Sequence, residues 1–206
     1  MIFAYTDDEL NALKRKDKRL AKVIEKIGRI EREGDENLFS SVIHHIIAQQ
    51  ISTKAQESIW ARFCGLFKTL GAKAVLSAGA EKIRSCGISA RKVEYILDFA
   101  RKVQSKEFDT QQIATMSDEN AIKELVKLRG IGVWTAEMIL LFCLQRKDIL
   151  SYDDLALQRG LKMLYGLDLN AKISKDEFAK FKKKFSPYAS IASLYLWELA
   201  GGRVEI

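Results

Sequence analysis

Leu128-Arg129-Gly130-Ile131-Gly132-Val133-Trp134-Thr135-Ala136 places two glycines around one isoleucine, between an amphipathic run and an almost wholly apolar one. Glycine permits a close backbone approach or a positive φ angle. A helix that begins after the second glycine directs N–H groups and a partial positive charge toward its own start. The stretch therefore predicts either a hairpin that grips a phosphate or an ordinary tight turn between two helices.

The composition is that of a basic chain with a sizeable core. The 206 residues include 34 Lys plus Arg against 27 Asp plus Glu, a formal charge of +7, and 48% are hydrophobic. This length predicts one large domain or two small lobes. The basic excess fits a nucleic-acid partner, and it also fits solubility alone. No apolar run could span a membrane and the start lacks signal-peptide features, so we expect no membrane association.

Cysteine and histidine usage argues against a metal centre. Cys64, Cys86 and Cys143 stand far apart without a Cys-x-x-Cys pair, which disfavours a disulfide frame, a zinc site or an iron–sulfur cluster and favours a reducing compartment. His44 and His45 are the only histidines. Neighbours on a helix point about 100° apart, so a structural role is favoured over metal binding. Walker-type loops, dinucleotide fingerprints and Ser-His-Asp sets are absent.

Apolar periodicity predicts an all-α fold, because one proline and no alternating strands interrupt the helical spacing. Up to Ile83 we expect one or two helices within 7–31, a core helix at 36–50, a helix opened by the capping box Thr53-x-x-Gln56, and two short helices between Gly71 and Ile83. Further along the chain we expect helices at 90–104, 118–128, 133–144, 154–165 and 187–200, and one that starts at the capping box Ser174-x-x-Glu177. The other predicted N-caps are Ser89, Ser117 and Ser186, the last followed by Pro187 at the first helical position.

Asp153 and Asp154 are the candidate catalytic groups. Aspartate is a preferred N-cap, worth about 1 kcal/mol, but capping needs only one of the pair. The other would lie in the first helical turn, where the helix field favours its anion. A fixed carboxylate suits a reaction whose transition state gains positive charge. The residues alone leave capping and catalysis both open.

Together, the hairpin, the apolar helix and an aspartate at a helix start resemble the helix-hairpin-helix DNA glycosylases, and among them the 3-methyladenine DNA glycosylase II family. The resemblance covers roughly 36–200. Besides the hairpin, its motifs are Ile46-Ile47-Ala48-Gln49-Gln50-Ile51-Ser52, Asp153-Asp154-Leu155-Ala156-Leu157-Gln158-Arg159 and Pro187-Tyr188-x-Ser190-x-Ala192-x-x-Tyr195-Leu196-Trp197. It implies two helical lobes with a cleft between them, formed by 36–130 with the hairpin at 118–144, and by 1–35 with 145–206, as one catalytic unit over 1–206.

The resemblance also implies roles for individual residues. Asp154 becomes the catalytic carboxylate and Asp153 the helix cap. The residues implied for the base pocket are Trp134, Met138 and Trp197; helical spacing alone would place each of them in the core. The residues implied for DNA binding are Gly130, Ile131, Gly132 and Thr135, with Gln50 and Ile51 as the wedge that enters the duplex. Gln50 could equally be a polar helix end.

No cofactor is required by this resemblance. The main-chain carbonyls of Val126, Leu128 and Ile131 match positions that hold a monovalent cation, Na⁺ or K⁺, in such hairpins. The absence of four clustered cysteines argues against the branch that carries an iron–sulfur cluster.

The implied function is a monofunctional glycosylase that flips N-alkylated purines, of the 3-methyladenine and 7-methylguanine type, out of duplex DNA and hydrolyses the N-glycosidic bond. Bifunctional relatives carry a lysine where this chain has Trp134, so no AP lyase activity is expected. The alternatives are a glycosylase for another damaged or mismatched base, and a non-catalytic helix-hairpin-helix DNA-binding protein. We expect a monomer, in the cytoplasm (nucleoid) of a prokaryote or in the nucleus of a eukaryote.

Overall fold

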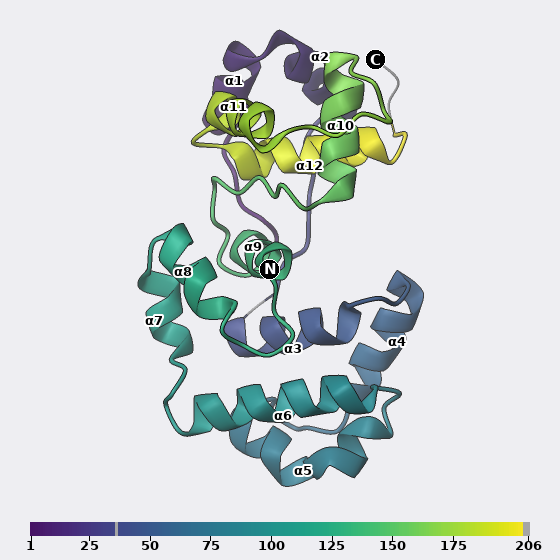
Figure 1. Cartoon of the computed structure of the whole chain (residues 1–206), viewed down its shortest axis with the longest axis vertical. Helices are drawn as coiled ribbons and strands as arrows, with labels where there is room; N and C mark the ends of the chain where they lie inside the picture. The colour runs from purple at the N-terminus through teal and green to yellow at the C-terminus, as the bar shows by residue number, and fades with distance from the viewer. Residues whose placement is uncertain (36, 204–206) are drawn as a thin grey trace. The chain divides into compact units, whose positions relative to one another are not determined.

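The computed structural model describes residues 1–35 and 37–203, and Glu36 and 204–206, which the predicted ranges include, lie outside them. The helices are α1 (Asp7–Lys16), α2 (Lys18–Ile27), α3 (Leu38–Ala48), α4 (Thr53–Cys64), α5 (Ala72–Arg84), α6 (Ala90–Gln104), α7 (Thr110–Thr115), α8 (Asp118–Leu125), α9 (Val133–Phe142), α10 (Leu155–Tyr165), α11 (Lys175–Phe185) and α12 (Ala189–Ala200) (Figure 1). The predicted all-α class is confirmed. The chain forms two compact units, residues 1–34 with 145–206, and residues 35–144. Among the described residues, no helix has the length and apolarity that a membrane span requires.

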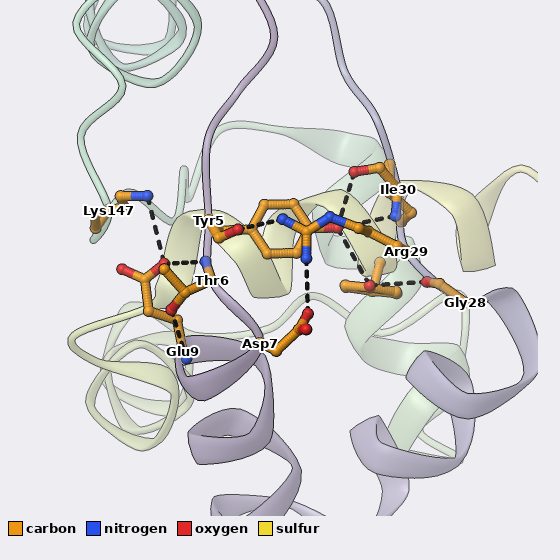
Figure 2. Close-up of polar contacts among 9 residues, drawn as sticks. Tyr5, Thr6, Asp7, Glu9, Gly28, Arg29, Ile30 and Lys147 are labelled. Atoms are coloured by element: carbon orange, nitrogen blue, oxygen red, sulfur yellow. Dashed lines mark hydrogen bonds and ion pairs between the residues drawn. The ribbon is translucent and has the colours of Figure 1, made fainter.

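In the first unit, the segments that flank α1 and α2 are tied together and to α12. The buried Tyr5 hydroxyl donates to the Ile30 carbonyl at 2.8 Å and accepts from the Ile30 N–H at 2.9 Å (Figure 2). The Tyr195 hydroxyl of α12 donates to the Gly28 carbonyl at 2.9 Å. The Arg29 guanidinium lies 4.3 Å from the centre of the Tyr5 ring. These contacts join the start of the chain to the segment after α2, and that segment to α12.

Helices α10 and α12 of the first unit approach each other closely because Gly160 has no side chain. A Cβ atom at Gly160 would lie 2.3 Å from the Leu196 carbonyl oxygen of α12. Two serines of α12 hold the loop that leads to α10. Ser190 Oγ accepts the Ile149 N–H at 2.8 Å, and Ser193 Oγ donates to the Ile149 carbonyl at 3.1 Å. The loop, α10 and α12 therefore form one packed block.

In the second unit, α3 and α9 supply much of the core. The predicted inward residues of α3, Val42, Ile43, Ile46 and Ile47, are all buried. Helix α9 is buried along most of its length but ends at Phe142 and exposes Val133 and Trp134 at its start. Gly79, with φ 74° and ψ 170°, interrupts α5, in agreement with the two short helices that were predicted there. Helix α7, capped by Asp109, was not predicted.

Several predicted helix starts are confirmed, and those at Thr53 and Ser186 are wrong. Ser89, Ser117 and Ser174 cap α6, α8 and α11 as predicted. Helix α4, however, is capped by Ser52, whose Oγ accepts the Ala55 N–H at 3.3 Å. Thr53 is therefore the first helical residue rather than the cap.

The predicted start of α12 at Ser186-Pro187 is also wrong. Ser186 ends α11, its peptide bond to Pro187 is cis, and α12 begins only after Tyr188. The Ser186 hydroxyl lies 2.9 Å from Asp148 Oδ2, and the Asp148 carboxylate also accepts the Ala189 N–H at 3.2 Å. A carboxylate from a distant part of the chain thus takes the place that the serine was expected to fill.

Candidate functional site

Asp154 is the buried carboxylate of the first unit that the sequence singled out. It is the N-cap of α10, where Oδ1 accepts the Leu157 N–H at 2.8 Å and the Trp197 indole N–H at 3.3 Å. The side chain is 8% exposed. The prediction that Asp153 caps this helix is wrong, because only the residue directly before the first helical one can reach the orphan amides; Asp153 lies one place earlier and is exposed.

The surroundings of Asp154 fix the direction of its carboxylate. The positive end of α10 and the indole N–H both point partial positive charge at it. Gln158, one turn into α10, donates from Nε2 to the Tyr152 carbonyl at 2.6 Å and so fixes the chain just before the cap. A carboxylate held in this way is a stationary negative charge that can stabilise positive charge developing opposite it.

In the second unit, the hairpin between α8 and α9 depends on Gly130. Its φ angle is +85°, and a Cβ atom there would lie 2.3 Å from the Tyr95 ring of α6. Gly132 is the N-cap of α9 and offers no side chain to the orphan amides of that helix start. Backbone N–H groups at such a start can bind an anionic oxygen.

A pocket of about 420 Å³ opens beside this hairpin in the second unit. The residues that line it are His45, Ala48, Gln49, Gln50, Gly130, Gly132, Trp134 and Thr135. The structure therefore brings together five predicted site residues there, which are Gln50, Gly130, Gly132, Trp134 and Thr135. Trp134 is 41% exposed, whereas Met138 is only 3% exposed and does not line this pocket.

The remaining predicted site residues are distributed as follows. Ile131 is buried in the hairpin, and Ile51 follows Gln50 after the end of α3. Trp197 belongs to the first unit with Asp154, whereas Trp134 and Met138 belong to the second. That Trp134, Met138, Trp197 and Asp154 share one base pocket stays a prediction.

Three residues near the hairpin were not singled out from the sequence. Gln49 Nε2 donates to the Gly130 carbonyl at 2.8 Å. Lys92 Nζ donates to the carbonyls of Ile47 at 2.9 Å and of Gln49 at 2.6 Å. Tyr95 forms the surface on which Gly130 rests. Each contact joins residues far apart along the chain, so periodicity carries no signal for it.

The two histidines differ in their surroundings. His44 Nδ1 lies 3.1 Å from Asp35 Oδ1, and His44 Nε2 lies 2.7 Å from the Gln56 amide nitrogen. His45 Nε2 is buried, lies 3.8 Å from Asp35 Oδ2, and has no hydrogen-bond partner among the described residues. Burial lowers the pKa of His45 to about 4, so its imidazole is neutral near pH 7.

Potential metal ligands are sparse. Across residues 1–35 and 37–203, no group of three or more His, Cys, Asp or Glu side chains could hold a metal ion. Burial raises the pKa of the Cys143 thiol to about 11. In the hairpin, the Leu128 carbonyl accepts the Ile131 N–H at 3.1 Å, and a carbonyl oxygen keeps a second lone pair for another ligand.

An all-α chain with a two-glycine helical hairpin and a buried aspartate at a helix start has the features of a helix-hairpin-helix DNA repair protein. Residues 43–187 match the family model described as HhH-GPD superfamily base excision DNA repair protein, and the chain belongs to this superfamily. The family relationship predicted from the sequence is thereby confirmed.

Relatives with solved structures share the fold over nearly the whole chain. The crystal structure of DNA-3-methyladenine glycosidase from Bacillus halodurans is 34% identical, with a TM-score of 0.83 over 95% of this chain and 90% of that one. The Schizosaccharomyces pombe 3-methyladenine DNA glycosylase in complex with abasic DNA is 26% identical, with a TM-score of 0.81 over 94% and 96%. YfjP of Bacillus subtilis is 30% identical over 171 residues, which are 79% of this chain but only 59% of YfjP.

Proposed function

We propose that the chain is a monofunctional DNA glycosylase that excises N-alkylated purines from double-stranded DNA in base excision repair, and that it acts as a monomer. The observation that carries this proposal is Asp154, a buried carboxylate fixed at the start of α10 by the Leu157 amide and the Trp197 indole. Similarity to 3-methyladenine DNA glycosylases of Bacillus halodurans and Schizosaccharomyces pombe supports the substrate class.

In the proposed reaction, Asp154 stands beside the sugar of a flipped nucleotide. The bond between C1′ and the base nitrogen breaks, and its electron pair goes to the base, which neutralises the positive charge that alkylation had placed there. The carboxylate stabilises the oxocarbenium-like sugar that results. A water molecule then bonds to C1′ and gives a proton to Asp154 or to solvent. The leaving base needs no protonation, because it departs as a neutral molecule.

The proposed base pocket uses aromatic faces to select cationic bases. The rings of Trp134 and Trp197 would enclose the flipped base, with Met138 as an adaptable wall. An aromatic face attracts a cation by about 0.5–2 kcal/mol. This attraction favours an alkylated, positively charged purine over a normal neutral one.

The proposed DNA grip lies in the second unit. The backbone of Gly130, Ile131 and Gly132, with Thr135 at the start of α9, would bind phosphate without reading sequence. Gln50 and Ile51 would fill the gap that a flipped base leaves, since extraction from the stack costs a few kcal/mol.

We also propose that Na⁺ or K⁺ binds the carbonyls of Val126, Leu128 and Ile131 and braces the hairpin. Replacing both cations by tetramethylammonium at equal ionic strength should weaken DNA binding, because this larger cation cannot be coordinated by carbonyls at such short range. Unchanged affinity would contradict the cation site.

The deciding experiment is a base-release assay on methylated DNA with the wild type and Asp154→Asn. Asparagine is as good an N-cap as aspartate, so the substitution removes the charge with little effect on α10. We expect a loss of release of about 100-fold or more. Asp153→Asn, at the exposed neighbour, is the matched control and should behave as wild type. Equal release by Asp154→Asn would reject the catalytic assignment.

The same assay separates the alternatives. Trp134 stands where a lyase needs an amine, so we expect no strand cleavage and no adduct trapped by borohydride. A trapped adduct would contradict monofunctional action. DNA binding without release from any methylated, oxidised or mismatched substrate would favour the non-catalytic alternative.

A further inference from the structure

The turn that follows α3 is tied to two other elements of the second unit. The Gln49 side-chain amide donates to the Gly130 carbonyl of the hairpin at 2.8 Å. Lys92, in the first turn of α6, donates from Nζ to the Ile47 carbonyl at 2.9 Å and to the Gln49 carbonyl at 2.6 Å. The turn that carries Gln50 is therefore held by the side chain of Gln49 and by the backbone carbonyls of Ile47 and Gln49.

These bonds meet two local needs. The last carbonyls of α3 have no partner within the helix, and a lysine ammonium supplies them with charged donors. Gln50 has a φ angle of 58°. A non-glycine residue in this region costs about 1–3 kcal/mol and persists only where the surrounding structure imposes the conformation. The bonds of Lys92 and Gln49 fix the residue directly before Gln50.

The hairpin is supported from the same helix. The Tyr95 ring of α6, one turn after Lys92, fills the space beside Gly130. One face of α6 thus contacts both the turn after α3 and the hairpin, while Gln49 joins these two elements directly. Movement of either element would break bonds to the other.

We propose that Lys92 and Gln49 are positioning residues that hold the Gln50 wedge and the phosphate-binding hairpin as one preformed element. This inference rests on the proposed function, because it takes Gln50 as the residue that enters the duplex. A preformed wedge avoids the entropy cost of ordering a loop during binding. Its benefit is greatest where a paired, stacked base must be displaced, and small where the base is already unpaired.

The test compares single-turnover release of 7-methylguanine from two DNAs. In one DNA the lesion is paired with cytosine in a duplex; in the other the same strand carries it inside an unpaired bubble. The variants are Lys92→Met, which keeps the length of the side chain, and Gln49→Ala, which removes the bond to the hairpin. The matched control is Lys102→Met, on the same helix, where the lysine pairs with Glu107 at 3.4 Å.

We expect both variants to lose about tenfold or more on the paired duplex and less than about twofold on the bubble, since the flipping cost of a few kcal/mol applies to the duplex. Lys92→Arg, which keeps the donors, should recover part of the duplex rate. Lys102→Met should match wild type on both DNAs. The bubble rate also reports whether each variant is folded.

A loss of equal size on both DNAs would assign Lys92 and Gln49 a merely structural role and overturn the inference. Unchanged rates on both DNAs would overturn it as well. If the wild type released no base from either DNA, the proposed function would fail, and the inference would fail with it.

Discussion

His45 is a largely buried histidine beside a carboxylate that already has other partners. Asp35 accepts hydrogen bonds from the Ser41 hydroxyl at 2.6 Å and contacts His44 at 3.1 Å. Burial raises the pKa of Asp35, but the bonds to His44 and Ser41 outweigh that effect and leave its pKa below the usual range. His45, by contrast, is 3.8 Å from Asp35, so burial dominates and lowers its pKa to about 4.

Stability should therefore fall as the pH is lowered. Unfolded His45 binds a proton below a pKa of about 6.5, whereas folded His45 does so only near 4. Between these values the unfolded state binds more protons, so the free energy of unfolding decreases by about 2 kcal/mol from pH 7 to pH 5. Asp35 adds a further loss as the pH falls through its lowered pKa. In thermal unfolding, the Tm of His45→Gln should decrease less than that of the wild type over this pH range. An identical decrease would show that His45 is not the source of the pH dependence.

At the scale of elements, the helices could be predicted where their signal is local. The apolar periodicity of α3 and α9 and the serine caps of α6 and α8 depend on neighbours within a few residues, and these were predicted correctly. The end of α11 and the start of α12 depend on Asp148, about 40 positions away in sequence. Its carboxylate accepts a hydrogen bond from the Ser186 hydroxyl. The bonds of Gln49 and Lys92 are likewise tertiary, so no reading of the sequence alone could place them.

The same distinction holds for Asp154. Its catalytic role is a prediction from the combination of motifs. That Asp154 rather than Asp153 caps α10 depends on a shift of one residue in the helix start. The indole N–H that reaches Asp154 comes from another helix. That contact exists because α10 and α12 approach closely at Gly160, which leads to a prediction at this scale.

Gly160→Ala should separate α10 from α12. The added Cβ would lie 2.3 Å from the Leu196 carbonyl oxygen, and since backbone rather than a flexible side chain lies there, one helix must shift. We expect a loss of about 1–3 kcal/mol in stability and a decrease in base release, because Leu196 directly precedes Trp197. Gly201→Ala is the matched control, since its Cβ would lie at 3.4 Å from the Trp197 carbonyl. The measurement is urea unfolding of both variants. Equal losses of unfolding free energy in Gly160→Ala and Gly201→Ala would contradict the close packing of α10 and α12.

For the whole molecule, the charge of +7 matters chiefly where cations lie near the proposed DNA grip. Arg129, inside the hairpin, stands 5.3 Å from the Tyr95 ring centre and 3.6 Å from Glu94 Oε2. An exposed ion pair of this kind contributes little to stability, so Arg129 can exchange Glu94 for a phosphate at small cost. The aromatic ring meanwhile keeps the guanidinium beside the hairpin.

DNA binding should accordingly weaken as salt rises, with Arg129 contributing one phosphate contact. Each neutralised phosphate releases counterions, so the logarithm of the binding constant falls linearly with the logarithm of salt concentration. Arg129→Gln should lower affinity at low salt and make the slope shallower by about one. Arg101→Gln is the control, because Arg101 makes an ion pair of the same kind, 3.8 Å from Asp98, but lies in α6 rather than in the hairpin. A titration in which both variants keep the wild-type slope would remove Arg129 from the interface, whereas binding independent of salt would argue against any phosphate grip by this hairpin.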